Sequence, residues 1–133
     1  MIDASDPRYS VEVLRRLREL PGAGSLPPGP DVAHGAAGDR EQGAEIEFDL
    51  GVRDGRVAEA RFRAFGCPHV LAVASWLTET VRGCDRDRVL EWDWQEAVDA
   101  LDVPPAKFGR LLTIQDALRA AARNWPAGER STV

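Results

Sequence analysis

The sequence predicts an α+β domain in which a small antiparallel sheet is covered by helices. Two strand-like segments, residues 44–50 and 56–64, flank Asp54-Gly55, a dipeptide typical of a hairpin turn. Segments with helical periodicity precede and follow this hairpin. A helix, a hairpin and then further helices is an order typical of α+β domains.

The length and composition indicate one domain. The chain has 133 residues, of which 44% are hydrophobic, enough for one compact core and too few for two ordinary domains. We therefore expect residues 1–133 to form a single domain, with flexible ends at 1–8 and 126–133.

The charge and the cysteine count exclude several classes of protein. A net charge of −5 argues against a nucleic-acid binder, which normally has a basic face. No apolar run has the length of a membrane span, and the amino terminus has no signal-peptide pattern, so the expected location is cytoplasmic. Two cysteines without a secretory signal predict reduced thiols.

The first predicted helix begins at Asp6-Pro7, where a capping carboxylate precedes a proline. Pro21-Gly22 ends this helix. The following residues, up to Gly43, are rich in Gly, Pro and Ala and predict a long, mostly irregular loop. The core-facing positions of the helix are Tyr9, Val13, Leu17 and Leu20.

Three helices are predicted after the hairpin. The first covers residues 70–81, and the second begins at Asp93, with Glu96 completing a capping box. The last runs from about residue 106 to 125, after the helix-breaking Pro104-Pro105. The apolar side of the last helix is formed by Phe108, Leu111, Leu112, Leu118, Ala121, Ala122 and Trp125.

Cys67 is the first candidate for chemistry. It lies between the second strand-like segment and the helix over 70–81, in Phe-Gly-Cys-Pro-His. A cysteine at a helix start meets the positive end of the peptide dipoles, which stabilises the thiolate that ligates metals and carries sulfur. The alternative is a small, buried and inert side chain, which is common for free cysteine.

Other polar residues are weaker candidates. His69 forms a Cys-x-His pair with Cys67, which suits one metal ion or assistance to the thiol, although a partly exposed histidine at a helix start needs no function. His34 in the predicted loop could approach the thiol, and Asp39 could supply an oxygen ligand, although Gly-Asp is usually a turn. Cys84 should lie about 20–25 Å from Cys67, at the other end of the intervening helix, with no role.

No pattern for an enzyme is present. The sequence has no Ser-His-Asp order, no phosphate-binding glycine loop and no His-Glu-x-x-His segment. The many carboxylates suit solvated faces. We therefore expect a protein that is not an enzyme.

Five segments in order resemble the IscU/NifU amino-terminal family, the scaffolds on which iron–sulfur clusters are assembled. They are Leu20-Pro21-Gly22-Ala23-Gly24-Ser25-Leu26, Ala36-Ala37-Gly38-Asp39, the hairpin ending at Cys67, Ala74 to Gly83, and Val103-Pro104-Pro105-Ala106-Lys107. The resemblance implies a sheet of about three strands with the general fold shared by SufE and NifU. The last segment is similar to the family's chaperone-binding motif.

The cluster ligands of the family are mostly missing. Carried over by position, the family's first cysteine falls on Ala37, and its last His-Cys pair falls on Gly109-Arg110. Only Asp39 and Cys67 match. With His69 nearby, the resemblance implies a poor site for an iron–sulfur cluster and a candidate site for one iron or zinc ion. Arg110 would favour a thiolate over a metal cation.

Three functions stay open at this point. The resemblance favours a divergent scaffold-like protein of iron–sulfur cluster assembly that binds iron or sulfur weakly through Cys67. The second is an acceptor of persulfide sulfur from a cysteine desulfurase, a role that SufE proteins perform with one cysteine. The third is a non-catalytic module that binds and regulates a desulfurase or a dedicated chaperone.

Overall fold

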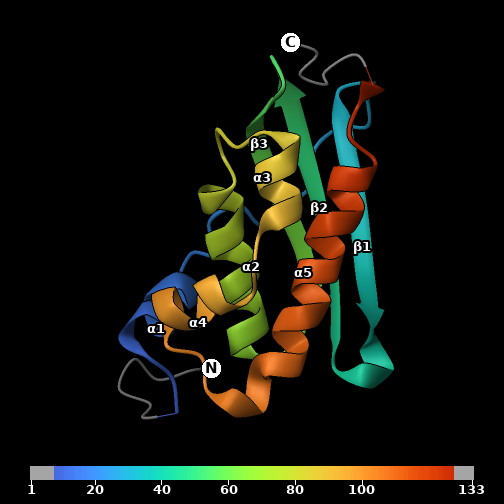
Figure 1. Cartoon of the computed structure of the whole chain (residues 1–133). Coiled ribbons are helices and arrows are strands. Elements are labelled where there is room, and N and C mark those ends of the chain that lie inside the picture. The colour runs from blue at the N-terminus through green and yellow to red at the C-terminus, as the bar shows by residue number, and fades with distance from the viewer. Residues whose placement is uncertain (1–7, 128–133) are drawn as a thin grey trace.

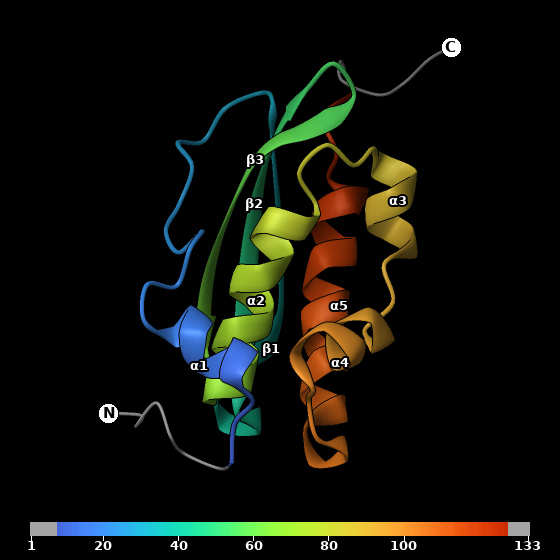
Figure 2. The ribbon, with the colours of Figure 1, turned by 90° about the vertical axis from the view of Figure 1, so that its left-hand side faces the viewer.

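The protein is a three-stranded antiparallel sheet with helices packed on one face (Figures 1 and 2). The computed structural model describes residues 8–127. The predicted α+β class and the sheet of about three strands are confirmed. The flexible ends expected at 1–8 and 126–133 fall almost wholly outside the described residues.

The strands lie in the order β1-β2-β3. Asp54 and Gly55 connect β2 to β3 with φ values of 55° and 75°, the left-handed geometry of a tight hairpin turn, so the predicted turn is confirmed. The strand bounds are Val32–Asp39 for β1, Ala44–Arg53 for β2 and Arg56–Phe65 for β3.

Two helices cover the sheet. Helix α2 packs on β3, while α5 packs on β1 and β2 (Figure 1). Helix α1 packs on α2, and α3 packs on α5. The helix bounds are Val11–Leu17 for α1, Pro68–Thr80 for α2, Arg86–Glu91 for α3, Gln95–Leu101 for α4 and Phe108–Arg123 for α5, with short 3-10 helices at Arg40–Gln42 (η1) and Pro105–Lys107 (η2).

The prediction of an irregular loop up to Gly43 is wrong over β1. At Gly35 of this strand, an added Cβ atom would lie 2.1 Å from the backbone nitrogen of Ala121 in α5. The glycine and alanine residues of β1 therefore let a helix backbone lie directly against the strand. The small residues that made this segment resemble a loop are therefore required by the close packing of α5 on β1.

The helix starts also differ from the predicted ones. Helix α1 begins at Val11, capped by the Ser10 hydroxyl, which accepts the N–H of Val13 at 3.2 Å. The predicted start at Asp6-Pro7 lies outside the described residues. Helix α4 begins two residues after the predicted Asp93, although the Glu96 carboxylate accepts the N–H of Asp93 at 3.2 Å, as a capping box requires. The six residues of α3, which were not predicted, are too few to show a helical period.

The core lies between the sheet and the helices. Ile46, Phe48 and Leu50 of β2 are almost wholly buried, as are Leu77 and Leu118 from the helices. Leu112, predicted on the apolar side of the last helix, is 44% exposed. Within residues 8–127, no helix is both long enough and apolar enough to span a membrane.

The segment from residue 21 to 31 crosses the sheet face opposite α5 (Figure 2). Asp49 holds it there, because its carboxylate accepts the N–H of Leu26 at 3.1 Å and pairs with Arg63 at 2.9 Å. Burial raises the pKa of Asp49, but hydrogen bonds from Arg63 and His34 outweigh it and lower the pKa to about 2. This segment is therefore fixed by a charged network that stays ionised at neutral pH.

Replacing Gly35 by valine should destabilise the fold by about 3 kcal/mol, because the added side chain overlaps the backbone of α5. Urea unfolding measures this loss. The matched control is Ala36→Val, since Ala36 is the exposed neighbour on the same strand. Equal stability of the two variants would contradict close packing at Gly35.

Candidate functional site at the Cys67 end of the sheet

Four segments meet at one end of the molecule, at the bottom of Figure 1. They are the end of β3, the start of α2, the turn between β1 and β2, and the start of α5. Phe65, the last residue of β3, pairs with Glu45 at the start of β2, so Cys67 follows beside that turn. The fold therefore brings Asp39, Cys67 and Arg110, which are far apart in the sequence, to the same end of the molecule.

Cys67 is the N-cap residue of α2, with extended backbone at φ −71° and ψ 170°. Pro68 occupies the first helical position, where its missing N–H costs nothing. The thiol is half-buried and makes no capping hydrogen bond of normal geometry. Cys67 is therefore neither a sealed core residue nor a freely solvated one.

The surroundings of the thiol favour its ionised form. Burial raises the pKa of Cys67, but the His69 side chain, the N–H of Val70, Arg110 and the N–H of His69 together lower it to about 6 from an ordinary 9.0. The two N–H groups belong to the first turn of α2, where the helix dipole is positive. The thiolate is therefore the main form at neutral pH.

Arg110 reaches the thiol from the first turn of α5. Its guanidinium lies near Gly43 in the β1–β2 turn, where an added Cβ would be 3.1 Å from Nη2. Gly43 has φ 89°, so this turn favours glycine on two grounds. Within residues 8–127, no carboxylate lies within ion-pair distance of Arg110. Its charge is therefore directed at the thiol without a competing partner.

His69 is buried, with 2% of its surface exposed. Its ring packs against Tyr9, with centroids 4.9 Å apart. Neither ring nitrogen has a hydrogen-bond partner of normal geometry among the residues described, although the imidazole is near enough to Cys67 to favour the thiolate. The alternative of a partly exposed His69 is therefore wrong. No sequence signal indicated this burial, because it depends on Tyr9 of a distant helix.

Asp39 ends β1 at the same end of the sheet. Its carboxylate accepts the N–H of Gln42 at 2.8 Å and so caps η1, which is the turn role considered from the sequence. In the part of the chain that the structure describes, no three His, Cys, Asp or Glu side chains form a group able to hold a metal ion. Binding of one metal ion by Cys67, Asp39 and His69 stays a prediction, and these residues do not fit a cluster with four ligands.

His34 and Cys84 lie away from this site. The ring of His34 is on β1, with Nδ1 2.8 Å from Oδ1 of Asp49, so it is not in a loop that could approach Cys67. Cys84 follows α2 at its far end, and its Sγ lies 3.7 Å from the Thr80 carbonyl oxygen. The two cysteines therefore cannot share a site within one chain.

The segment with the predicted chaperone-binding motif directly precedes α5. Val103 is buried, whereas Pro105 and Ala106 are exposed, and Pro104 and Lys107 are half-buried. Part of the motif is thus accessible near the Cys67 end. Its partner-binding role stays a prediction.

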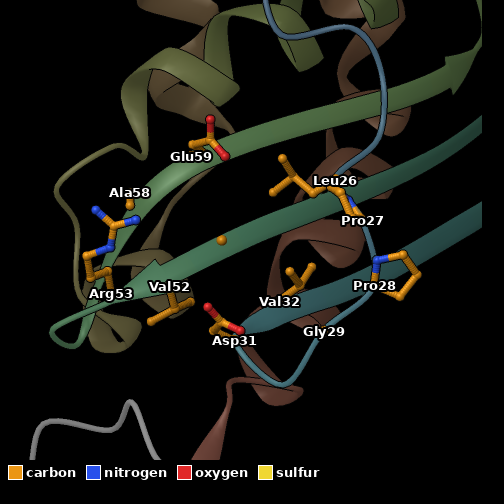
Figure 3. Close-up of a pocket in the computed structure, with 11 residues that line it drawn as sticks. Leu26, Pro27, Pro28, Gly29, Asp31, Val32, Val52, Arg53, Ala58 and Glu59 are labelled. Carbon is orange, nitrogen blue, oxygen red and sulfur yellow. The ribbon is translucent and has the colours of Figure 1, made fainter.

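A surface hollow lies near the other end of the sheet (Figure 3). Its lining includes Leu26 and Pro28 of the crossing segment, Arg53 at the end of β2, and Glu59 of β3. It contains neither cysteine. The hollow is therefore separate from the site at Cys67.

Comparison with known proteins agrees with this architecture. The family model described as "NifU-like N terminal domain" matches residues 8–132. The chain belongs to the NifU-like N-terminal domain family. Iron–sulfur cluster assembly proteins are its relatives, and members of the family are scaffold proteins rather than enzymes.

Two relatives of this NifU-like domain show how far the similarity extends. The scaffold protein IscU of Escherichia coli is 27% identical over 119 residues, which are 88% of this chain and 93% of IscU. Iron sulfur cluster assembly protein 2 of Saccharomyces cerevisiae mitochondria is 30% identical over 97 residues, 71% of this chain. The match spans 62% of the yeast protein's length.

Solved structures share the fold. An iron–sulfur cluster assembly scaffold protein for the SUF system from Fervidobacterium islandicum superposes with a TM-score of 0.66 at 16% identity, covering 89% of this chain and 98% of that chain. A NifU-like protein from Brucella abortus gives 0.63 at 20% identity, covering 92% and 96%. At these identities the likeness concerns the fold alone.

Alkylation of Cys67 by iodoacetamide should increase with pH around a midpoint near 6, because the thiolate is the reactive form. A lowered pKa means that the thiolate is already formed below neutral pH. In urea, where the neighbouring groups are lost, the midpoint should rise towards 9.0. Peptide mass spectrometry measures Cys67 separately from Cys84. Equal midpoints in the native and the unfolded chain would contradict the proposed environment.

Proposed function

We propose that this NifU-like domain serves iron–sulfur cluster assembly as a divergent scaffold-like protein that accepts sulfur on Cys67. The observation that carries this proposal is the half-buried Cys67 thiol with a pKa near 6, at the start of α2 and beside Arg110, which has no carboxylate partner within residues 8–127. Such a thiol is a nucleophile at neutral pH. Among residues 8–127, the ligands needed to hold a cluster are not gathered around it.

The sulfur donor is the persulfide of a cysteine desulfurase. The Cys67 thiolate attacks the outer sulfur of that persulfide and forms a new S–S bond. The bond between the two donor sulfurs breaks, and its electron pair leaves with the desulfurase cysteine as a thiolate. The transferred sulfur keeps its oxidation state, so no further oxidant or reductant is required, and its proton is released to solvent, which leaves a persulfide anion on Cys67.

Binding of iron at Cys67 is the second candidate, and family membership favours it. The site would be completed by Asp39 and His69, or by Cys67 of a second copy of the chain. In this case iron is a substrate of cluster assembly, which the protein receives together with sulfide. Anaerobic reconstitution with iron and sulfide, followed by absorbance and iron counting, tests this candidate. Iron retained equally by the native protein and by Cys67→Ala would remove Cys67 from the site.

A desulfurase and a dedicated chaperone are the partners that this function requires. The exposed Pro105 and Ala106, beside the start of α5, support the chaperone contact. A non-catalytic module would bind the same partners without carrying sulfur. The two roles therefore differ in whether sulfur appears on the chain.

Incubation with a cysteine desulfurase and L-cysteine should add one sulfur atom to Cys67, seen as a mass increase of the intact protein. Cys67→Ser should lose this addition completely, because serine cannot form a persulfide. Cys84→Ser is the matched control and should keep it, since Cys84 lies at the far end of α2.

Two results would contradict sulfur acceptance at Cys67. One is sulfur added equally to Cys67→Ser. The other is no added sulfur with several desulfurases while the protein still binds them, which would favour the non-catalytic module.

A further inference from the structure

We propose that Arg110 determines the specificity of the site around Cys67, so that this site holds an anionic sulfur group and excludes metal cations. This inference deepens the proposed function and rests on it only for the identity of the sulfur donor. It concerns the position where the family's ligand pair falls on Gly109-Arg110. It depends on contacts at three sides of the thiol.

The first side is Arg110 itself. Its guanidinium is near enough to Cys67 to stabilise the thiolate, and no carboxylate in residues 8–127 neutralises it. An arginine stays charged at all physiological pH values and presents several N–H donors in one plane. Such a group attracts a second anionic sulfur bonded to Sγ and repels a divalent cation at the same place.

The second side is the start of α2. The N–H groups of His69 and Val70 face the thiol at the N-terminus of a 13-residue helix. These donors lie at the positive end of the peptide dipoles, where anions are favoured. These N–H groups do not stabilise a bound cation.

The third side is the His69 imidazole. Only 2% of the surface of His69 is exposed. Neither ring nitrogen has a hydrogen-bond partner of normal geometry among the described residues. A buried polar group without a partner is costly and indicates a ligand that the protein receives. A sulfur atom added to Cys67 is placed beside this ring and offers it a partner.

Gly43 keeps the approach of Arg110 open. A side chain there would lie against the guanidinium, at 3.1 Å from Nη2, and the backbone φ of 89° favours glycine. The β1–β2 turn thus leaves space for the arginine to reach the thiol. Arg110, the start of α2 and His69 together form one anion-binding site around Cys67.

The test for metal exclusion uses Zn²⁺ alone, measured by calorimetry under reducing conditions. Arg110→Gln should bind Zn²⁺ about tenfold more tightly than the native protein, because a nearby positive charge is removed. The gain should disappear in Arg110→Gln combined with Cys67→Ser. Arg110→Lys keeps the charge and should bind as weakly as the native protein.

Arg40→Gln is the matched control. Arg40 lies at the same end of the molecule, over the ring of Phe65, and its loss changes the net charge equally. Its Zn²⁺ affinity should stay native. Equal Zn²⁺ affinities of Arg110→Gln and Arg40→Gln would overturn metal exclusion by Arg110.

Sulfur retention is tested without a desulfurase by using sodium tetrasulfide. The Cys67 thiolate attacks one sulfur, an S–S bond of the tetrasulfide breaks, and the shorter polysulfide leaves as an anion. After removal of the reagent, Arg110→Gln and His69→Gln should lose the added sulfur several-fold faster than the native protein and Arg40→Gln. Equal lifetimes of the added sulfur in all four proteins would overturn the anion-binding site.

The two proposals can fail separately. If the protein retains sulfur from tetrasulfide but receives none from any desulfurase, the proposed function fails and the anion-binding site stands. If a desulfurase transfers sulfur equally to the native protein and to Arg110→Gln, and the sulfur lifetime is the same in both, the proposed function stands and the role of Arg110 fails.

Discussion

The close contact between α5 and β1 is the constraint on which the rest of the structure depends. At Gly35 the strand has no side chain, so the helix backbone at Ala121 comes directly against it. This contact sets the position of α5 across β1 and β2. Because α5 is one continuous helix, it also places Arg110, about three turns before Ala121, at the turn containing Gly43. The charge beside Cys67 is therefore a consequence of packing elsewhere.

At that end two sources of positive charge lie beside the thiol. The start of α2 contributes peptide dipoles, and α5 contributes a guanidinium. Although the chain as a whole is acidic, the half-buried thiol experiences this local field. The fold is that of the solved scaffold structures, but a fold does not fix the residues of its site.

Local patterns predicted much of the fold. The hairpin turn at Asp54-Gly55 needs left-handed backbone at two adjacent residues, which this dipeptide adopts readily. A helix after Cys67 was predicted over residues 70–81 from its apolar spacing, and α2 begins two residues earlier, at Pro68, because proline suits the first helical position. Strand β1 was missed, because its glycines and alanines give neither alternation nor β-branched side chains. Helix α3 was missed because six residues are too few to show a period.

The sequence by itself determined that one cysteine precedes a helix, and its resemblance to the related scaffolds predicts Arg110 at one of their ligand positions. Both follow from neighbours along the chain or from position in the family. Only the tertiary structure decided that His69 is buried against Tyr9, that His34 is bound by Asp49, and that Arg110 is unpaired within the described residues. Burial and pairing are set by residues far apart in sequence, which meet only after the helices dock on the sheet.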